Sequence, residues 1–479
     1  MTMQKPVSKA NRFFEHFEQL APTYDSYKKR YSYYWNDITN YYNYFIHEED
    51  SVLEVGCGTG DTISKLKGKK KAGLDFSPAM IEVAKKQHPS IDFYLMDAAD
   101  ISLTEKFDVI VLSSVIGCVD NVLDVFNSLK AVCHEHTRII ISYYNYLWEP
   151  FLKFGELIGI KKSSPQQNWL SYRDIQNLLY LAGFDAYKMN RRQLIPINIP
   201  IISWLSNRYI AKLPIINHLT LTQFSFARPY FNNNQNVDTK YSSTIVIPAR
   251  NEAGNIENAI LRMPKFGKHQ EIIFVEGNST DNTWEVIQEI AEKYKDTHDI
   301  KICQQPGKGK GDAVRKGYSI ATGDILMILD ADLTVPPEDL PKFYDAIASG
   351  KGEFINGSRL VYPMEDNAMR PLNTLGNKFF SAVFTWMLEQ PIKDSLCGTK
   401  VMFREDYYKL VANRTFFGEF DPFGDFDLLF GAYKLNLKII DMPIRYRDRV
   451  YGETNISRFK HGLLLLRMCW FAAGKVKFI

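Results

Sequence analysis

Two widely separated stretches of the chain open in the same way, with an apolar β-type run, a turn and a helical pattern. The first begins near Ser51 as SVLEVGCGTGDTISKL, and the second begins near Ser242 as SSTIVIPARNEAGNIENAI. After each opening, short apolar runs such as FDVIVLSS and DILMILDAD keep alternating with helical patterns. Such alternation predicts mostly parallel sheets covered by helices. We therefore predict an α/β protein with two doubly wound domains in tandem.

A polar segment separates the two openings. FNNNQNVDTKYSS, from 231 to 243, is rich in asparagine and poor in apolar residues, which is typical of a linker. We predict a first domain over 1–230, a linker over 231–241 and a second domain over 242–479. The 479 residues, 45% of them hydrophobic, suffice to fill more than one core.

Charge and cysteine usage exclude several classes of protein. The net charge of +3 gives no general attraction for nucleic acid, and the six scattered cysteines contain no CxxC pair. The first residues lack the apolar core of a signal peptide. No stretch reaches the roughly 18 to 20 apolar residues of a membrane span, because LIPINIPIISWLSNRYIAKLPII from Leu194 is broken by prolines and charges. The sequence predicts a cytoplasmic protein.

The C-terminal stretch GLLLLRMCWFAAGKVKFI is apolar but interrupted by Arg467 and Lys475, with further basic residues upstream. One interpretation is a basic amphipathic helix lying on the inner face of an anionic membrane. The other is a helix packed on its own domain. The sequence leaves both open.

The first opening carries a glycine turn and two later acidic residues. In VLEVGCGTG, glycines at 56, 58 and 60 allow a sharp turn and a close approach to a ligand. Asp75 ends the next predicted strand and Asp97 ends the one after it. All of these positions fall at the carboxyl edge of one sheet, where open α/β folds bind ligands. The pattern is GxGxG, whereas the dinucleotide turn is GxGxxG.

Taken together, VLEVGCGTG, GLDFSPAMIEVA, YLMDAAD and FDVIVLSSVIGCV resemble the class I S-adenosylmethionine-dependent methyltransferases, which have a Rossmann-like sheet. The resemblance covers residues 50 to about 145 and implies S-adenosylmethionine as cofactor. It assigns the methionine part to Glu54 with Gly56, Gly58 and Gly60, the ribose to Asp75, the adenine to Asp97 and Ala98, and a covering role to Tyr24. The methyl acceptor is not indicated by the sequence.

In the second domain, the apolar run ILMILDADLTVPPEDL ends in two carboxylates one residue apart. Side chains alternate faces along a strand, so a strand continuing through this run would place Asp330 and Asp332 on the same side. Two ionised carboxylates held close together repel each other unless a cation lies beside them. Hard oxygen ligands suit Mg²⁺ or Mn²⁺.

Four motifs then appear in order, namely STIVIPARNEAGNI, FVEGNSTDNT, GKGKGDAVRKG and DADLTVPPE. They resemble family 2 glycosyltransferases with the GT-A fold, in the branch of dolichyl-phosphate mannose synthases and bacterial polyprenyl-phosphate glycosyltransferases. The resemblance implies a nucleotide-sugar donor and direct displacement with inversion. It places Pro248, Arg250, Glu252 and Glu276 near the nucleotide, Lys308, Lys310 and Gly311 near the diphosphate, and Asp330 and Asp332 at the metal as the DxD motif.

This chain departs from that family's pattern at two points. Glu276 and Gly277 stand where the family usually has paired aspartates, which alters the contact to the base. Thr334 stands where polyprenyl-phosphate relatives often carry glutamine, which makes a third metal contact doubtful.

The acceptor has two interpretations. By family analogy, four basic residues suit an anionic acceptor, polyprenyl phosphate, whose oxygen attacks without a protein base: Arg359, Arg370, Arg458 and Lys460. A sugar hydroxyl would instead need a general base, and Asp425 and Asp427 in FGDFDLLF lie in a suitable region. Both aspartates equally suit a helix-capping role.

For the whole chain, the leading hypothesis is a bifunctional enzyme of glycan or glycolipid biosynthesis, combining methyl transfer with metal-dependent sugar transfer. A second is a glycosyltransferase whose first domain only binds the cofactor as a regulatory module. A third, a nicotinamide dehydrogenase joined to a nucleotidyltransferase, accounts for the same alternation of strands and helices.

Overall fold

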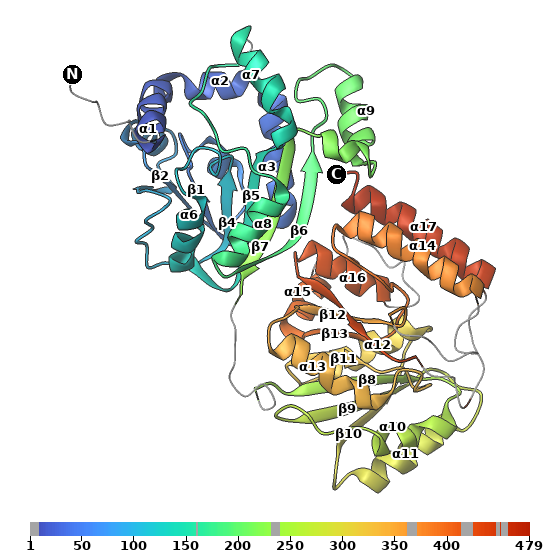
Figure 1. Ribbon diagram of the computed structural model, residues 1–479. Helices are drawn as coiled ribbons and strands as arrows, with labels where there is room; N and C mark the ends of the chain where they lie inside the picture. Colours follow the sequence, from blue (N-terminus) through green and yellow to red (C-terminus); the bar gives the residue numbers. More distant parts are fainter. Residues whose placement is uncertain are drawn as a thin grey trace, which may run out of the picture. The chain divides into compact units, whose positions relative to one another are not determined.

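The computed structural model describes residues 9–159, 161–230, 240–361, 371–412, 425–446, 451 and 458–479. Contacts divide the chain into two compact units. The first comprises Met1–Phe231 with Phe478–Ile479, and the second comprises Asn232–Lys477. Each contains a seven-stranded sheet with helices on both faces, so the α/β prediction is confirmed (Figure 1).

The first sheet has the strand order β3-β2-β1-β4-β5-β7-β6. Strands β1 to β5 are parallel, and β7 is antiparallel to both of its neighbours. The order reverses at β1, so the crevice between the ends of β1 and β4 is a topological switch point, where such sheets bind ligands. The strands are β1 (Ser51–Val55), β2 (Lys70–Asp75), β3 (Asp92–Leu95), β4 (Phe107–Ser113), β5 (Cys133–Tyr144), β6 (Phe184–Arg192) and β7 (Thr222–Pro229).

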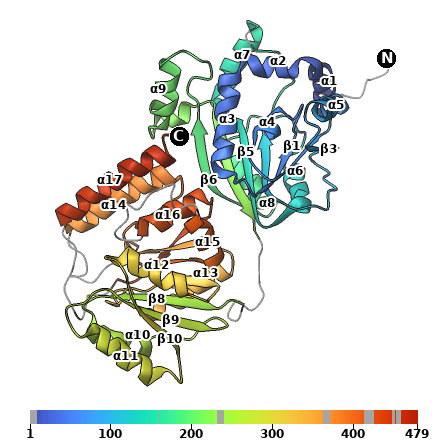
Figure 2. The same ribbon diagram turned by 180° about the vertical axis from the view of Figure 1, so that it is seen from behind.

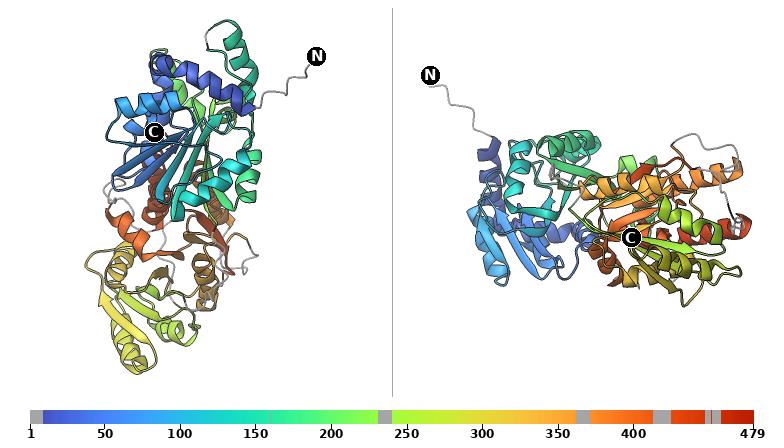
Figure 3. Two further views of the ribbon diagram at one scale, coloured as in Figure 1. Left: turned by 90° about the vertical axis from the view of Figure 1, so that its left-hand side faces the viewer. Right: turned by 90° about the horizontal axis from the view of Figure 1, so that it is seen from below.

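Helices cover both faces of this sheet. Helices α6 and α8 lie in front of it in Figure 1, whereas α3 lies in front when the molecule is seen from behind (Figure 2). In the left view of Figure 3, its blue strands run between blue helices and cyan to green helices. The helices are α1 (Lys9–Leu20), α2 (Tyr24–Arg30), α3 (Ser32–Phe45), α4 (Asp61–Lys65), α5 (Pro78–Gln87), α6 (Val122–Leu129), α7 (Glu149–Leu157), α8 (Tyr172–Leu181) and α9 (Ile202–Arg208).

The second sheet has the strand order β10-β9-β8-β11-β13-β12-β14. Strands β10, β9, β8 and β11 are parallel, and β13 runs antiparallel between β11 and β12. The strands are β8 (Ser243–Ala249), β9 (Gln270–Glu276), β10 (Asp299–Gln304), β11 (Ile325–Ile328), β12 (Phe354–Ser358), β13 (Lys400–Phe403) and β14 (Ile439–Pro443).

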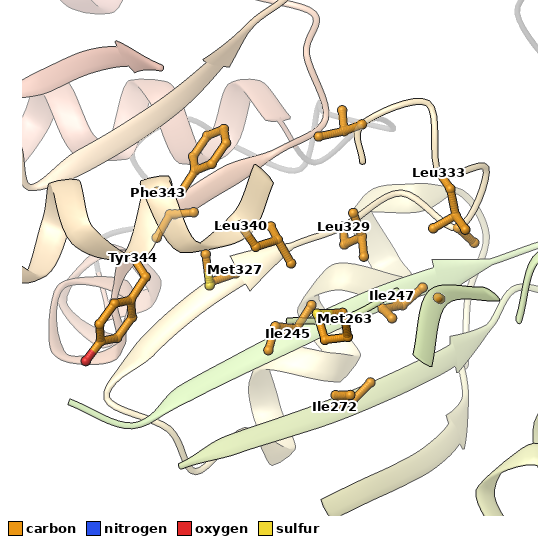
Figure 4. Packing of buried hydrophobic residues seen from close by; sticks show 14 of the residues in the cluster. Ile245, Ile247, Met263, Ile272, Met327, Leu329, Leu333, Leu340, Phe343 and Tyr344 are labelled. Carbon is orange, nitrogen blue, oxygen red and sulfur yellow. The ribbon is translucent and has the colours of Figure 1, made fainter. Parts of the chain in front are cut away.

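Alternation along β8 divides the core of the second unit into two layers. Ile245 and Ile247 are fully buried in one hydrophobic cluster with Met327, Leu340 and Phe343 (Figure 4). Val246 points the other way, toward Gly317 of α12. The helices are α10 (Ile256–Leu261), α11 (Thr283–Tyr294), α12 (Lys310–Ile320), α13 (Leu340–Ala348), α14 (Pro371–Leu388), α15 (Arg404–Ala412), α16 (Asp425–Lys434) and α17 (Arg458–Val476).

Helix α17 contacts α14 within the second unit. Among the described helices, α17 included, none is both long enough and apolar enough to cross a bilayer.

Candidate active sites

The loop after β1 is folded by glycines. Gly56, Gly58 and Gly60 have φ angles of 72°, 54° and 79°, a left-handed region in which side chains are strained. Gly56 N and Cys57 N donate to Leu74 O of β2, at 2.8 and 2.9 Å. A Cβ at Gly60 would lie 2.7 Å from Phe93 Cζ. Substitution at these positions would therefore disturb the loop as well as any ligand on it.

Asp75 ties this loop to the end of β2. Its two carboxylate oxygens accept hydrogen bonds from Gly58 N at 2.8 Å and Ser77 N at 3.0 Å. The side chain is buried, and burial raises its pKa despite these backbone donors. Burial has removed water from this carboxylate. A ligand hydroxyl that donates a hydrogen bond to it would take the place of that water.

Glu54 is the second buried carboxylate at this edge. Its Oε2 accepts from Ile63 N of α4 at 2.9 Å. Burial raises the pKa of Glu54 to about 8, although Lys28 opposes the shift. A carboxyl group in this state gains stability when a cation binds beside it, which fits the ammonium group of an amino-acid cofactor.

Sequence reasoning missed Lys28. Its ammonium lies 2.9 Å from Thr62 Oγ1, 3.3 Å from Asp61 Oδ2 and 4.4 Å from the centroid of the Trp35 ring. The residue is 6% exposed, so this lysine side chain is enclosed beside the first residues of α4. Nothing in YDSYKKRYSYYW distinguishes Lys28 from Lys29; only the fold selects it.

The remaining predicted residues of the first site lie at the same edge. A Cβ at Gly58 would lie 3.4 Å from Tyr24 Cε1, so the tyrosine ring covers the glycine loop. Asp97 is exposed and accepts from Ala99 N at 2.8 Å, whereas Ala98 is buried. They follow β3, which pairs with β2 up to Asp75. The structure therefore brings these residues to one edge of the sheet; that they bind a cofactor stays a prediction.

Asp330 and Asp332 lie in a turn and not in a strand. Strand β11 ends at Ile328, so the assumption that a strand continues through both aspartates is wrong. The turn is formed instead by Leu333, whose φ of 51° is unusual for a branched residue. Thr334 donates to Asp332 Oδ1 from its backbone N at 3.2 Å and its hydroxyl at 2.8 Å. Thr334 thus orients the second carboxylate.

Lys310, the first residue of α12, forms an ion pair with Asp330, with 2.6 Å between Nζ and Oδ1. Both side chains are about one quarter exposed. Gly398 lies directly against this pair, because a Cβ there would collide with Asp330 Oδ2 and Lys310 Nζ. No site role was predicted for Gly398 in DSLCGTK. The structure adds Gly398 as the residue that allows this turn to approach the DxD motif.

The carboxylates fit a divalent cation. Mg²⁺ is commonly held by one or two carboxylates together with substrate phosphates. Asp330 and Asp332 provide two such groups on one turn, with Lys310 as a cation already beside the first. Within the described part of the chain no group of three or more His, Cys, Asp or Glu side chains could hold a metal.

The loops after β8 and β9 form the predicted nucleotide side of this site. Glu276 is buried and accepts from Ser279 N of its own loop at 2.5 Å and from Gln304 Nε2 at the end of β10 at 3.2 Å. Glu252 is also buried and accepts from Asn255 Nδ2 at 2.8 Å. Both glutamates therefore shape the loops. Of the other residues predicted here, Arg250 and Lys308 are exposed, Pro248 is partly exposed and Gly311 is buried in α12.

Arg359 is paired within the protein. Its Nε and Nη2 donate to the two oxygens of Asp394, at 2.7 and 2.9 Å. Asp394 is fully buried and also accepts from Arg359 N and Asn377 Nδ2, at 3.0 and 2.9 Å. Burial opposes ionisation of Asp394, but the guanidinium outweighs it and lowers the pKa to about 2. This pair fixes the loop that leads to Gly398.

Among the described residues, several buried oxygens in or next to the same loop have no hydrogen-bond partner. They are Asn356 Oδ1, Ser358 Oγ, Asn377 Oδ1, Ser395 Oγ and Thr399 Oγ1. Buried polar atoms are normally hydrogen-bonded, so ordered water or a bound group is expected to complete them.

The structure does not describe the side chains of several residues that were predicted to act at the acceptor. Arg370 lies outside the described residues. The backbones of Asp425 in α16 and of Arg458 and Lys460 in α17 are described, but their side chains lie outside the description. Asp427 is 9% exposed in the first turn of α16, where a carboxylate is favoured by the helix dipole.

Comparison with known proteins assigns a class to each unit. Residues 46–187 match the model of a methyltransferase domain, and residues 244–411 match the model of glycosyl transferase family 2. The chain thus combines a methyltransferase domain with a family 2 glycosyltransferase domain, which confirms the two resemblances.

The similar proteins agree with this division. Dolichol-phosphate mannosyltransferase of Pyrococcus furiosus is 38% identical over 226 residues, which cover 45% of this chain and 59% of that protein. Undecaprenyl-phosphate 4-deoxy-4-formamido-L-arabinose transferase of Shewanella sediminis is 33% identical over 142 residues, which cover 29% of this chain and 41% of that protein. The chain therefore spans about half the length of these relatives.

Among solved structures, a SAM-dependent methyltransferase of Thermotoga maritima aligns with 45% of this chain, and the alignment includes 99% of that protein's chain. The sequence identity is 15% and the TM-score is 0.36.

Proposed function

We propose that the chain is a bifunctional enzyme with two catalytic units. The first transfers a methyl group from S-adenosylmethionine. The second transfers a sugar from a nucleotide sugar to polyprenyl phosphate, with inversion and with a divalent metal ion. The observation that carries the proposal is the cluster of Asp330, Lys310 and Gly398 beside Asp332, because it combines cation-binding carboxylates with a cation suited to a diphosphate.

In the sugar transfer, Asp330 and Asp332 would hold Mg²⁺ or Mn²⁺, which offsets the negative charge growing on the leaving nucleoside diphosphate. Lys310, which is paired with Asp330 in this structure, would lie beside the metal ion and be available to the diphosphate. Arg250 and Lys308 are exposed and available to the same anion. Thr334 keeps Asp332 oriented throughout.

Polyprenyl phosphate is favoured as acceptor because both relatives are named for lipid-phosphate substrates. A phosphate oxygen is anionic at neutral pH and attacks the anomeric carbon without a protein base. Arg359 is engaged by Asp394, so we assign it to positioning the Gly398 loop. Direct contact with the acceptor phosphate is left to Arg370, Arg458 and Lys460.

In the methyl transfer, Glu54 with Gly56, Gly58 and Gly60 would hold the methionine part of the cofactor, and Asp75 the ribose. Asp97 and Ala98 would contact the adenine, and Tyr24 would cover the loop. Methyl transfer from a sulfonium needs chiefly an in-line approach of the acceptor, so positioning carries much of the rate.

The second unit is also proposed to contact the inner face of the membrane through α17. Leu463, Leu466 and Trp470 are exposed at helical spacing on one side of this helix, and Arg467 lies among them. An apolar stripe with a basic residue suits an anionic bilayer surface.

The sugar transfer is tested by incubating the chain with polyprenyl phosphate, Mg²⁺ or Mn²⁺ and a panel of sugar nucleotides, with products identified by mass spectrometry. The Asp330→Asn, Asp332→Asn double variant should lose at least about a hundredfold in rate. Asp339→Asn, at a partly exposed acid paired with Lys342, is the matched control and should keep its rate. Transfer at full rate in the double variant under chelation would refute the metal assignment; products only on sugar hydroxyls would refute the acceptor.

The methyl transfer is tested with a radiolabelled methyl donor offered to lipid and glycan fractions. We expect labelled product from the unchanged chain and none from the Asp75→Asn variant. Cofactor binding without any methylated product would make the first unit a regulatory module, and tight binding of NAD in its place would refute the cofactor assignment.

A further inference from the structure

Aromatic rings gather at the carboxyl edge of the first sheet, beside the proposed cofactor site. Tyr144 is the last residue of β5, and its ring centroid lies 6.3 Å from that of Tyr34 in α3. Tyr34 in turn packs edge-on against Trp35, with 5.0 Å between the ring centroids. Tyr24 covers the glycine loop of the same edge. We call this set the aromatic wall; its members are Tyr24, Tyr27, Tyr34, Trp35 and Tyr144.

The aromatic wall already holds one ammonium group. Lys28 Nζ lies 4.4 Å from the centroid of the Trp35 ring and 5.6 Å from that of the Tyr24 ring. Both distances are within the roughly 6 Å at which the face of a ring attracts a cation. Asp61 Oδ2 lies 3.3 Å from the same ammonium, which offsets its repulsion of a second cation.

Tyr144 is the accessible member of the run that follows the body of β5. Its neighbour Tyr143 is 4% exposed, and the Tyr143 hydroxyl lies 3.3 Å from Ser225 Oγ. Asn145 is 1% exposed and donates to Thr220 O at 2.9 Å. These two neighbours are therefore engaged inside the unit, whereas the Tyr144 side chain stays partly exposed at the sheet edge.

The hydroxyl groups of the aromatic wall remain protonated near neutral pH. Burial raises the pKa of Tyr144 well above its usual value and raises that of Tyr27 to about 12. Burial also raises the pKa of Tyr24, and the charges of Glu54 and Asp75 raise it further. The wall thus presents neutral phenols next to acids, a setting that favours a cation over an anion.

A hydroxyl acceptor would need a general base to remove its proton. The groups that most affect Tyr144 are the hydroxyls of Tyr34 and Tyr27 and the thiol of Cys118, and none of these is a histidine or a carboxylate. Glu54 and Asp75 are assigned to the cofactor. A neutral amine needs no base for its attack, because its nitrogen already carries a lone pair.

We propose that the aromatic wall binds the methyl acceptor and that this acceptor is a primary or secondary amine. The nitrogen lone pair forms the new N–C bond as the S–C bond of the methyl donor breaks with its electron pair left on sulfur. The positive charge thus passes from sulfur to nitrogen, and the ring faces attract it in both positions. The methylated ammonium then loses a proton to water. This inference rests on the proposed function and deepens it by naming the class of acceptor.

The test uses a probe that carries the charge of the product. Choline and its uncharged isostere dimethylbutanol, in which carbon replaces the ammonium nitrogen, are titrated separately into the full chain saturated with S-adenosylhomocysteine. The methyl resonances of each probe are followed by NMR, since aromatic rings shift them upfield. We expect choline to bind about tenfold more tightly than the isostere, because several ring faces attract its charge.

Two variants locate the binding site of the probe. Tyr144→Leu should reduce the preference for choline at least about threefold, while S-adenosylhomocysteine still binds. Tyr27→Leu, at another partly exposed member of the wall, should act in the same direction and serves if the first variant fails to fold. Tyr180→Leu, at a tyrosine of α8 that is 76% exposed, is the matched control and should keep the full preference.

Three outcomes would overturn the proposal. Equal affinity for the two probes would show that the wall is merely apolar. An unchanged preference in both variants of the wall would place the cation elsewhere on the chain. Failure to bind choline by a chain that binds S-adenosylhomocysteine would refute the amine acceptor alone, whereas failure to bind S-adenosylhomocysteine itself, measured first by calorimetry, would refute the proposed methyl transfer.

Discussion

The two candidate sites hold their carboxylates in opposite ways. In the first unit, Glu54 and Asp75 are buried, receive backbone N–H groups and have raised pKa values. In the second unit, Asp330 is partly exposed and paired with Lys310, and the buried Asp394 is paired with Arg359. Burial makes ionisation of Glu54 and Asp75 unfavourable, so binding of a cation beside them is favoured. Asp330 and Asp394 are already paired with cations, which makes their surroundings compatible with an anion and its metal ion. Each arrangement matches the charge of its proposed ligand.

The largest effect is expected at the buried ion pair of the second unit. Asp394→Asn would leave the Arg359 guanidinium without its counterion and should destabilise this unit by about 3–5 kcal/mol. Hydrogen exchange read separately in β12, β13 and the first sheet measures this, and only the second unit should lose protection. Glu257→Gln, at a surface pair with Lys293, is the control with little expected effect. Equal losses in both units would show that their stabilities are not independent.

The approach of the Gly398 turn to the DxD motif gives the next largest effect. Gly398→Ala must displace Asp330 or Lys310, since the new Cβ has no room. A displacement of this kind should reduce sugar transfer by about a hundredfold while methyl transfer stays unchanged. Steady-state rates with saturating donor measure it. Gly376→Ala in α14, where nothing lies within 4 Å of the new Cβ, is the matched control. An unimpaired Gly398→Ala variant would mean that the contact does not position the site.

The buried glutamate of the first unit predicts a pH dependence. The pKa of Glu54 is about 8 without ligand, and an ammonium beside it would lower that pKa, so binding releases a proton. Affinity for S-adenosylmethionine should therefore rise by up to about tenfold per pH unit as pH approaches 8. Calorimetry in buffers of different ionisation enthalpy measures the released proton. Glu54→Gln should abolish the release; a release that persists would place the proton elsewhere.

The raised pKa of Glu54 also makes the free energy of unfolding depend on pH when no ligand is bound. Since the folded pKa of Glu54 is raised, its contribution is fully present below the unfolded value of 4.5 and is lost as pH rises through about 8. Asp394 behaves oppositely: its pKa is lowered to about 2, so its contribution is present above 3.8 and lost as pH falls toward 2.

The smallest effect concerns the attachment of α1 to the cofactor edge. Glu18 Oε1 accepts from Ser77 Oγ at 2.5 Å and from Ala79 N at 3.1 Å, at the N-terminus of α5. Glu18→Gln should cost about 0.5–1 kcal/mol, since it removes a negative charge from the positive end of a helix. Denaturant unfolding of the first unit measures it against Glu15→Gln, an exposed position of the same helix. No difference between the two variants would show that α1 is held by its apolar contacts alone.

The sequence already contained the two α/β units and the residues at their ligand edges. The hydrophobic periods of strands and helices differ enough to be recognised in short stretches of sequence. Glycine at 56, 58 and 60 predicts a left-handed turn, because other residues are strained in that conformation. The DxD motif was likewise recognised, but its geometry was not: the strand stops at Ile328, and Leu333 makes the turn.

Only the tertiary structure selected Lys28 from a run of similar residues, paired Arg359 with Asp394, and brought Gly398 against Asp330 and Lys310. These contacts join residues far apart in the chain, and no local pattern specifies them. What the sequence determined by itself is the local backbone preference and the type of chemistry at each sheet edge. Which charges are buried, and which cation neutralises each acid, depends on packing between distant segments and was decided by the fold.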